Sequence, residues 1–380
     1  MNPPATLAEL DTPSLLLERG KIEVNAARMR AHIESLGAKL RLHVKTAKCL
    51  EVTRIVQGEA PGPITVSTLK EAEEFAAHGY RDILYGVAFA PGKLARALAI
   101  ARSGVRLSIV LDNLESARSI AAALRPEDPE LPVLLEIDCD GHRSGLAPED
   151  PAILEIARAL RGSRARVNGV MTHAGESYNC RSTDAIRTMA GRERDAVVRA
   201  ATRLREASFD APVVSVGSTP TATFADDLSG VTEVRAGVFV FFDLVMAGIG
   251  VCRVEDIALS VLGTVIGHQK SKGWTITDAG WMAMSRDRGT AKQPLDQGYG
   301  IVCDATGKPL DGLIMSDASQ EHGIISHRSG DPAQMPHLPV GTQVRILPNH
   351  ACATAAQYDR YRVLSGDQRI EATWTRFSGW

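Results

Sequence analysis

Three groups of residues have the types and spacing that catalysis needs, and the first is built around Lys45. Residues 42–45 read Leu-His-Val-Lys and predict the end of a buried strand, and residues 49–57 continue as a helix. Desolvation at the mouth of a strand favours the neutral amine, which can form a Schiff base with a carbonyl. A strand-end lysine in a salt bridge is the alternative that this stretch leaves open.

The second group is Gly217-Ser218-Thr219, which enters a predicted helix at Pro220. Free backbone N–H groups and two hydroxyls at a helix N-terminus bind phosphate well, although simple N-capping by Ser218 or Thr219 explains the same pattern. A Schiff-base lysine combined with a phosphate cradle indicates pyridoxal phosphate, which needs both and also a partner for its ring nitrogen.

The third group is His350 and Cys352, in the segment that reads Pro-Asn-His-Ala-Cys. Alternate residues of a strand share a face, so this imidazole and this thiolate could reach one ion, and the pair suits zinc. Two ligands are fewer than a structural zinc site uses, so water or substrate would complete the shell. Packing in a core is the alternative for an isolated His-x-Cys.

These groups need a scaffold, and the chain supplies alternating strand and helix signals after a strand at residues 13–18 and a helix at residues 21–35. Eight apolar runs separated by helical stretches demand a parallel sheet and indicate an α/β fold that closes into a (β/α)8 barrel. An open doubly wound sheet is the alternative, but its glycine fingerprint is absent after the first strand. The runs are residues 42–45, 64–67, 83–87, 107–111, 133–137, 167–172, 213–216 and 234–237.

Active sites of such barrels lie at the carboxyl ends of the strands. Polar, glycine-rich segments follow several of these strands, notably at residues 136–145, 172–178 and 217–221. After Asp243 the pattern changes to β-rich runs with weak helical periodicity, and strands are expected at residues 257–266, 274–278, 312–315, 343–347 and 361–364. We therefore expect the barrel over residues 20–245 and a β-rich domain that carries the metal pair over residues 246–380, joined by residues 1–19.

Composition excludes several classes of function. The 380 residues carry a net charge of −2, and no basic stretch is interleaved with aromatics, which argues against a nucleic-acid partner. No apolar run approaches the ~20 residues of a membrane span, and residues 1–10 do not resemble a signal peptide. The six cysteines are scattered without a Cys-x-x-Cys pair, so we expect reduced thiols and a cytoplasmic protein.

Longer motifs extend from Asp11-Thr12-Pro13 to the His350 segment. They read His-Val-Lys-Thr at 43–46, Val-Ser-Thr-Leu-Lys-Glu-Ala-Glu at 66–73, Asp-Gly-His-Arg-Ser-Gly at 140–145, Gly-Ser-Thr-Pro-Thr at 217–221, Glu-Val-Arg-Ala-Gly at 233–237, Gly-Trp-Met-Ala-Met-Ser-Arg-Asp at 280–287 and Gln-Glu-His-Gly at 320–323. With these motifs the chain resembles the fold-type III pyridoxal phosphate enzymes, and within them the D-threonine aldolase and D-serine dehydratase group. The resemblance implies an alanine-racemase-like barrel, a β domain and a homodimer whose active site lies between the barrel of one subunit and the β domain of the other.

The resemblance also implies a role for individual residues. Lys45 would carry the cofactor, and Gly217, Ser218 and Thr219 would bind its phosphate. Tyr178 would be the partner of the pyridine nitrogen, and Arg143 would lie near the phenolic oxygen. His350 and Cys352 would hold a divalent metal, either zinc, manganese or magnesium. Leu42 departs from the proline that is frequent before the histidine, and Cys352 favours the dehydratase branch over the His-x-Asp of the aldolases.

The expected activity is dehydration of a D-3-hydroxy amino acid to a 2-oxo acid and ammonia. D-threo-3-hydroxyaspartate is the first candidate, with D-serine and D-threonine as the others. Retro-aldol cleavage to glycine and an aldehyde is the alternative within enzymes, with His322 as a possible base, and a non-catalytic pyridoxal phosphate carrier is the alternative outside them. Residues 285–292 contain three cations that could bind a dicarboxylate, although exposed cations are usually solvated.

Overall fold

The structure is a computed structural model that describes residues 6–58, 60–365 and 368–380. The chain divides into two compact units. The barrel unit consists of Ala27–Gly237 with Phe377–Trp380, and the sheet unit consists of Met1–Ala26 with Val238–Arg376. The divisions expected from the sequence were at residues 19/20 and 245/246.

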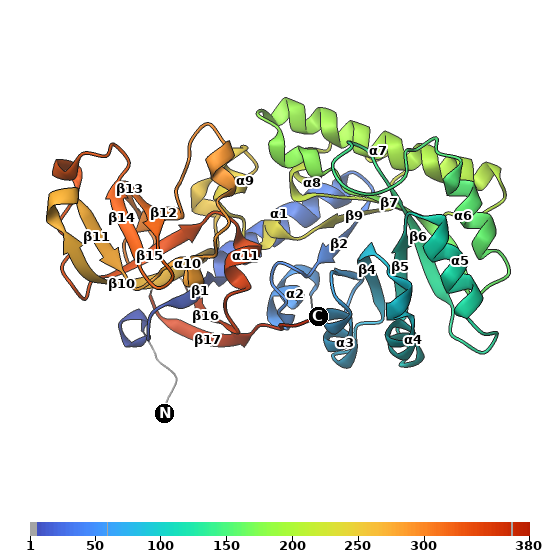
Figure 1. The fold of residues 1–380 in the computed structure, drawn as a ribbon, viewed down its shortest axis with the longest axis horizontal. Helices are drawn as coiled ribbons and strands as arrows, with labels where there is room; N and C mark the ends of the chain where they lie inside the picture. Colours follow the sequence, from blue (N-terminus) through green and yellow to red (C-terminus); the bar gives the residue numbers. More distant parts are fainter. Residues whose placement is uncertain (1–5, 59, 366–367) are drawn as a thin grey trace. The chain divides into compact units, whose positions relative to one another are not determined.

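The barrel unit is a closed parallel barrel of β2 to β9, and the open doubly wound alternative is wrong. Closure comes from the pairing of the first and last of these strands, in which Leu42 of β2 is opposite Ala236 of β9. Helices alternate with the strands, as Figure 1 shows from blue to yellow. The strands are β2 (Lys39–His43), β3 (Ile64–Val66), β4 (Asp82–Ala88), β5 (Arg106–Leu111), β6 (Leu131–Ile137), β7 (Ala165–Thr172), β8 (Val213–Val216) and β9 (Glu233–Ala236). The helices are α2 (Leu50–Gln57), α3 (Leu69–Ala77), α4 (Leu94–Arg102), α5 (Leu114–Ala123), α6 (Ala152–Leu160), α7 (Thr183–Glu206) and α8 (Thr219–Phe224), and α1 (Arg19–Ser35) precedes them.

Burial explains why the barrel strands read as continuous apolar runs. All seven residues of β6 are buried, as expected for a parallel strand covered on both faces. β4 to β7 each contribute one residue to an apolar cluster of Leu84, Val110, Leu134 and Met171. The long helix α7 packs on β7 and β8, and the Ser182 side chain caps its N-terminus. Helix α7 therefore supports β8, which precedes the phosphate-binding candidates, and β7, which precedes the loop of Tyr178.

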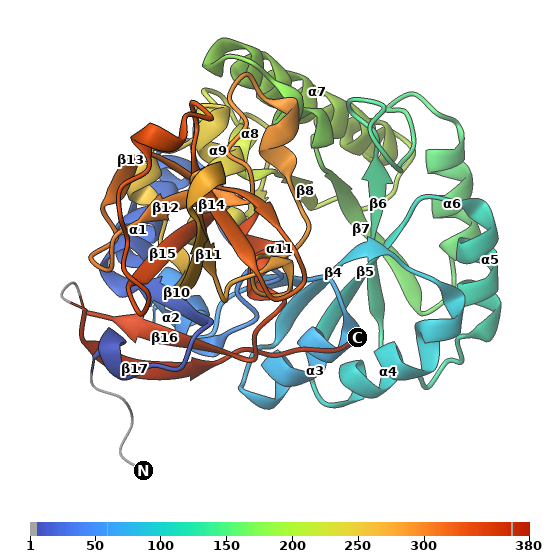
Figure 2. The same cartoon turned by 60° about the vertical axis from the view of Figure 1, so that its left-hand side comes forward.

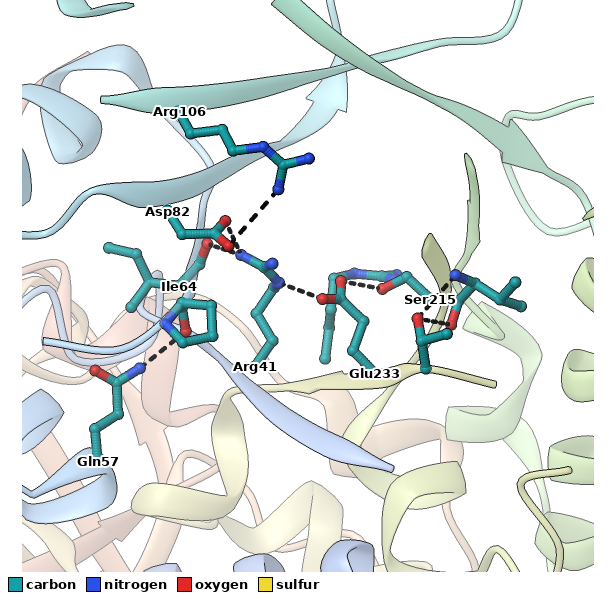
Figure 3. A network of polar contacts seen from close by, with 11 residues as sticks. Arg41, Gln57, Ile64, Asp82, Arg106, Ser215 and Glu233 are labelled. Carbon is teal, nitrogen blue, oxygen red and sulfur yellow. Dashed lines mark hydrogen bonds and ion pairs between the residues drawn. The ribbon is translucent and has the colours of Figure 1, made fainter. Parts of the chain in front are cut away.

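A polar network joins several barrel strands, and Figure 3 shows Arg41 of β2 between Asp82 of β4 and Glu233 of β9. The Arg41 guanidinium is 3.0 Å from Asp82 and 2.8 Å from Glu233. Glu233 also accepts a hydrogen bond from Ser215 Oγ at 2.7 Å, and Ser215 accepts one from Arg235 at 2.7 Å. Buried charges need such partners, and this network fixes the register of β9 against β2 and β8.

The sheet unit contains a nine-stranded sheet in the order β11-β14-β13-β12-β15-β10-β1-β16-β17, and all of its strands except the N-terminal β1 are seen in orange and red in Figure 2. β1 (Ser14–Glu18) lies between β10 and β16, so the N-terminal strand does join this unit. The others are β10 (Leu259–Gln269), β11 (Trp274–Thr277), β12 (Gly300–Cys303), β13 (Pro309–Ala318), β14 (Gly323–His327), β15 (Gln343–Pro348), β16 (Arg360–Leu364) and β17 (Ile370–Thr375). Its short helices are α9 (Leu244–Gly248), α10 (Trp281–Met284) and α11 (Ala351–Ala355).

No helix of the described ranges is long and apolar enough to cross a membrane. All six cysteines are free, in agreement with the expectation of reduced thiols.

Candidate active site

Lys45 lies in the turn after β2, two residues beyond the strand end at His43. Lys45 is exposed, so the desolvation predicted for it is wrong for a single chain. A side chain at the end of a barrel strand is buried only where other residues cover that end of the barrel. The neighbouring Lys48 is different, because its Nζ lies 3.0 Å from Glu71 Oε1 and only 15% of its side chain is exposed. The salt-bridged alternative therefore describes Lys48, and Lys45 remains the candidate for the Schiff-base lysine.

Two neutral imidazoles accompany Lys45. Burial, followed by the charge of Lys45, holds the pKa of His43 well below its usual range. Burial also lowers the pKa of His173 to about 3, with smaller contributions from the charges of Lys45 and Arg143. His173 Nδ1 donates to the Gly217 carbonyl at 2.8 Å, which leaves Nε2 as the unprotonated nitrogen. Residues at the ends of β2, β6, β7 and β8 are therefore close enough to interact electrostatically or by hydrogen bonds.

Gly217 has both of its backbone polar groups in use. Its N–H donates to Glu193 Oε1 at 3.0 Å, and its carbonyl accepts from His173. The Ala174 N–H donates to the same Glu193 oxygen at 3.0 Å, so one buried carboxyl group ties together the loops after β7 and β8. Gly217 has φ +148°, and a Cβ would lie 1.9 Å from the Arg235 carbonyl oxygen. Its place in the site is explained by close backbone packing, and its N–H is already committed to Glu193.

Ser218 and Thr219 are adjacent, but their hydroxyls are in different situations. Ser218 caps α8: its Oγ accepts from the Thr221 N–H at 3.2 Å and lies 2.9 Å from both Thr221 Oγ1 and Ser177 Oγ. Ser218 is therefore the N-cap of α8. Thr219 Oγ1 is buried and has no hydrogen-bond partner among the described residues. A phosphate oxygen would satisfy this hydroxyl, so the loop fits a phosphate through Thr219.

The loops that carry Arg143 and Tyr178 are bonded to each other. Asp140 Oδ2 accepts from the Glu176 N–H at 2.8 Å. His142 Nδ1 lies 2.8 Å from Glu176 Oε1. These two contacts join the loop after β6, which carries Arg143, to the 3-10 helix Gly175–Asn179 after β7, which carries Tyr178.

Arg143 and Tyr178 both lie beside the residues that surround Lys45. Arg143 Nη2 is 3.4 Å from Glu136 Oε1, but 59% of the Arg143 side chain is exposed, which leaves its charge accessible to a ligand. The half-buried Tyr178 ring lies 6.2 Å from the His173 ring, with the planes at 50°. The structure therefore brings the cofactor-binding candidates to one end of one barrel.

The metal-binding candidates lie in the sheet unit, and His350 is held by a carboxylate. Its Nδ1 is 2.6 Å from Asp287 Oδ2, and it also hydrogen-bonds Cys352. Burial opposes the charged imidazole, but these two contacts outweigh it and raise the pKa of His350 to about 11. A carboxylate on one ring nitrogen fixes the orientation of a metal-binding histidine and leaves the other nitrogen for the ion. The donor set therefore fits a divalent metal.

The strand geometry predicted for this pair is wrong. Cys352 is in the first turn of α11, and His350 is the extended residue just before it, so the two are not alternate residues of a strand. The buried Asp243 accepts from the Ala351 N–H at 2.9 Å and holds this turn in place. Within the described ranges, no three His, Cys, Asp or Glu side chains form a metal-binding group. A metal at His350 and Cys352 would keep positions for water or substrate.

Comparison with known proteins assigns the chain to a family. Residues 17–245 match the family model of the alanine racemase N-terminal domain, and residues 258–364 match that of the putative serine dehydratase domain. The chain belongs to the alanine racemase N-terminal domain family. It is 50% identical to the D-threo-3-hydroxyaspartate dehydratase of Delftia sp. (strain HT23) over 99% of both chains, and 30% identical to the D-serine dehydratase of Dictyostelium discoideum over 95% of both.

Solved structures agree with this assignment to the alanine racemase N-terminal domain family. The structure of the Delftia dehydratase superposes with a TM-score of 0.95 at 50% identity, over 99% of this chain and 100% of that one. A variant of that dehydratase with alanine in place of a cysteine is described as metal-free, and another has alanine in place of a histidine. The D-threonine aldolase of Filomicrobium marinum, at 23% identity and a TM-score of 0.82 over 99% of this chain and 98% of that one, shares the fold.

Sequence reasoning missed three residues that position the candidate site. Glu193 lies within α7, and nothing in a helical pattern marks it as the partner of Gly217. Asp287 belongs to the motif at residues 280–287, but the motif does not show that its carboxylate contacts His350. Gly237 was predicted at a strand end, but the sequence does not show why this position requires glycine. A Cβ here would lie 2.6 Å from the His43 carbonyl oxygen.

Proposed function

We propose that the protein is a pyridoxal phosphate- and divalent-metal-dependent dehydratase, a carbon–oxygen lyase that converts a D-3-hydroxy amino acid to a 2-oxo acid and ammonia. D-threo-3-hydroxyaspartate, which gives oxaloacetate, is the best substrate candidate. The observation that carries this proposal is the 50% identity to a D-threo-3-hydroxyaspartate dehydratase over 99% of both chains. A cytoplasmic homodimer is the state in which we propose that it acts.

The barrel residues supply the acid–base part of the reaction. Pyridoxal phosphate held on Lys45 would provide the electron sink for charge at Cα. The Lys45 amine would remove the α-proton, and its exposure leaves it free to move between cofactor and substrate. Thr219 would anchor the phosphate, and the accessible guanidinium of Arg143 would face the phenolic oxygen.

The neutral imidazole of His173 and the phenol of Tyr178 would keep positive charge away from the ring. The pKa of about 3 for His173 means that it carries no proton on Nε2 at neutral pH. Tyr178 as partner of the pyridine nitrogen would leave the cofactor ring less electron-poor than a carboxylate partner would. Departure of the β-hydroxyl therefore needs separate assistance.

His350 and Cys352 would give that assistance. A divalent ion on these two residues would act as a Lewis acid toward the β-hydroxyl. Asp287 would hold the His350 ring in its ligating orientation, at 2.6 Å from Nδ1. Zinc, manganese and magnesium are the ions to test, and a thiolate ligand favours zinc.

The proposed function is tested by product analysis. Purified enzyme is incubated with D-serine, D-threonine and both diastereomers of D-3-hydroxyaspartate, and 2-oxo acid, ammonia, aldehyde and glycine are measured. We expect 2-oxo acid and ammonia in equal amounts, fastest from D-threo-3-hydroxyaspartate. Glycine with an aldehyde would establish the aldolase reaction, and no product from any of the four would indicate a carrier.

A further inference from the structure

The loop of residues 284–290 in the sheet unit is fastened to the metal-binding segment at three places. Thr354 Oγ1 donates to the Met284 carbonyl at 2.7 Å. His350 Nδ1 meets Asp287 at 2.6 Å. Further along, the Thr290 N–H and hydroxyl bind Asn349 Oδ1 at 2.9 and 2.6 Å. The loop is therefore a fixed part of the metal site's surroundings.

Ser285 of this loop has a backbone conformation that is unusual for a residue with a side chain. Its φ of 71° and ψ of 165° fall in a region that is essentially restricted to glycine. Ser285 is buried, and its Oγ accepts from the Asp287 N–H at 3.2 Å. Strain of this kind persists where surrounding bonds impose it, and it is concentrated at ligand-binding and active sites. Here it sets the direction of the next residue, Arg286.

Arg286 is an exposed cation beside the metal ligands. Its guanidinium carbon lies 5.2 Å from the centre of the Trp281 ring, and among the described residues it pairs with no carboxylate. Arg288, two residues later, is different: its Nη2 is 2.7 Å from Asp296 Oδ2, and it lies over the Tyr299 ring. The charge of Arg288 is already compensated, whereas that of Arg286 is open to an anion.

A dicarboxylate substrate would use a cation beside the residues that bind its hydroxyl. In 3-hydroxyaspartate, C3 carries both the hydroxyl and the second carboxylate, so a group that binds this carboxylate must lie beside the group that binds the hydroxyl. Arg286 is one residue, about 3.8 Å between Cα atoms, from Asp287, whose carboxylate holds His350. A guanidinium matches a carboxylate with two parallel hydrogen bonds.

We propose that Arg286 binds the second carboxylate of a 3-hydroxyaspartate substrate and thereby sets the preference for this dicarboxylate over D-serine. The inference rests on the proposed function and adds to it the residue that selects the substrate. The Trp281 ring holds the guanidinium in place by a cation–π contact.

The test compares Arg286→Gln with the matched control Arg288→Gln on two substrates. For Arg286→Gln, kcat/KM with D-threo-3-hydroxyaspartate should fall about ten- to hundredfold, mainly through KM, because a charge-assisted hydrogen bond is lost. kcat/KM with D-serine should change less than threefold, roughly the scatter expected for a surface substitution. Arg286→Lys should recover part of the loss, and Arg288→Gln should leave the ratio of the two substrates unchanged.

Binding of unreactive analogues gives a readout that does not need turnover. Malate is 3-hydroxyaspartate without its amino group, and 3-hydroxypropionate is serine without its amino group. Calorimetry on the metal-loaded protein should show that Arg286→Gln weakens malate binding and leaves 3-hydroxypropionate binding unchanged. Equal losses for both analogues and both substrates, or no loss for either dicarboxylate, would overturn the inference. If the wild type dehydrates neither substrate but binds malate through Arg286, the proposed function alone fails.

Discussion

Lys48 Nζ lies 3.0 Å from Glu71 Oε1, and 1% of the Glu71 side chain is exposed. The Thr68 side chain, the Ser67 N–H and Lys48 all meet this carboxylate. Lys48 is therefore a structural cation at the start of α3, although it is only three residues from the reactive candidate Lys45. The two lysines of this short segment therefore have different roles: Lys48 is structural, and Lys45 is the candidate for the reaction.

We expect the purified protein to be yellow and borohydride reduction to fix the cofactor onto Lys45, as read by peptide mass spectrometry. Lys45→Ala should abolish turnover without unfolding the protein, because Lys45 is exposed. In Lys48→Met the label should stay on Lys45, while the free energy of unfolding falls by up to about 3–5 kcal/mol because the buried Glu71 carboxylate loses its cationic partner. Label on Lys48 in either protein would reverse the assignment.

Thr219→Val should weaken pyridoxal phosphate binding about ten- to hundredfold and leave pyridoxal binding unchanged, because Thr219 Oγ1 has no other partner to serve in the described structure. Ser218→Ala should act differently, since Ser218 caps α8. It should lower the free energy of unfolding by about 0.5–2 kcal/mol and weaken both ligands alike. Fluorescence titration of cofactor-free protein measures each affinity. A selective loss of pyridoxal phosphate binding in Ser218→Ala would mean that Ser218, and not Thr219, binds the phosphate.

His173 should make stability depend on pH. Its pKa is lowered from 6.5 to about 3 in the folded protein, so the unfolded chain binds a proton that the folded one does not. This contribution is present in full above pH 6.5 and is lost as the pH falls toward 3, with a slope of up to about 1.4 kcal/mol per pH unit.

The matching variant is His173→Gln, whose amide can still donate to the Gly217 carbonyl. Urea unfolding at several pH values between 7 and 4 should show that wild type loses stability faster than the variant on acidification. A difference that is constant over this range would mean that His173 titrates normally in the folded protein.

The sequence predicted the scaffold well because its information is local. The alternation of apolar runs and helices predicted all eight barrel strands, and β6 shows why: a strand buried along its whole length must be apolar along its whole length. β12, β14 and β17 were missed. β17 alternates between half-buried and exposed residues, and β12 and β14 are short and begin with glycine.

The site was predicted less completely because its details depend on contacts distant in sequence. Two neighbouring hydroxyls at a helix start look equivalent in a sequence, and only the Ser177 and Thr221 contacts show that Ser218 is the cap. The same holds for Asp287, which lies 63 residues from His350. The metal pair was identified by residue type and by resemblance, and its strand geometry was wrong because α11 begins at Ala351.

Metal removal should separate the two halves of the proposed reaction. If His350 and Cys352 hold the ion that assists departure of the β-hydroxyl, chelation should stop 2-oxo acid release but leave exchange of the α-proton, because exchange needs only the cofactor and Lys45. The Lewis-acid contribution is several kcal/mol, hence on the order of a thousandfold in rate. The measurement is deuterium incorporation at Cα alongside 2-oxo acid release, with and without chelator.

Two variants make the metal prediction specific. Cys352→Ala should behave like the chelated wild type and should not be rescued by zinc or manganese. Asp287→Asn should keep both ligands but lower metal affinity by about ten- to a hundredfold, because the His350 ring loses its orienting carboxylate at 2.6 Å. Its activity should then return at high metal concentration. If α-proton exchange and 2-oxo acid release fall together in the chelated wild type and in both variants, the metal positions the whole substrate. If an aldehyde is formed in place of the 2-oxo acid, the enzyme is an aldolase and Cys352 does not mark a dehydratase.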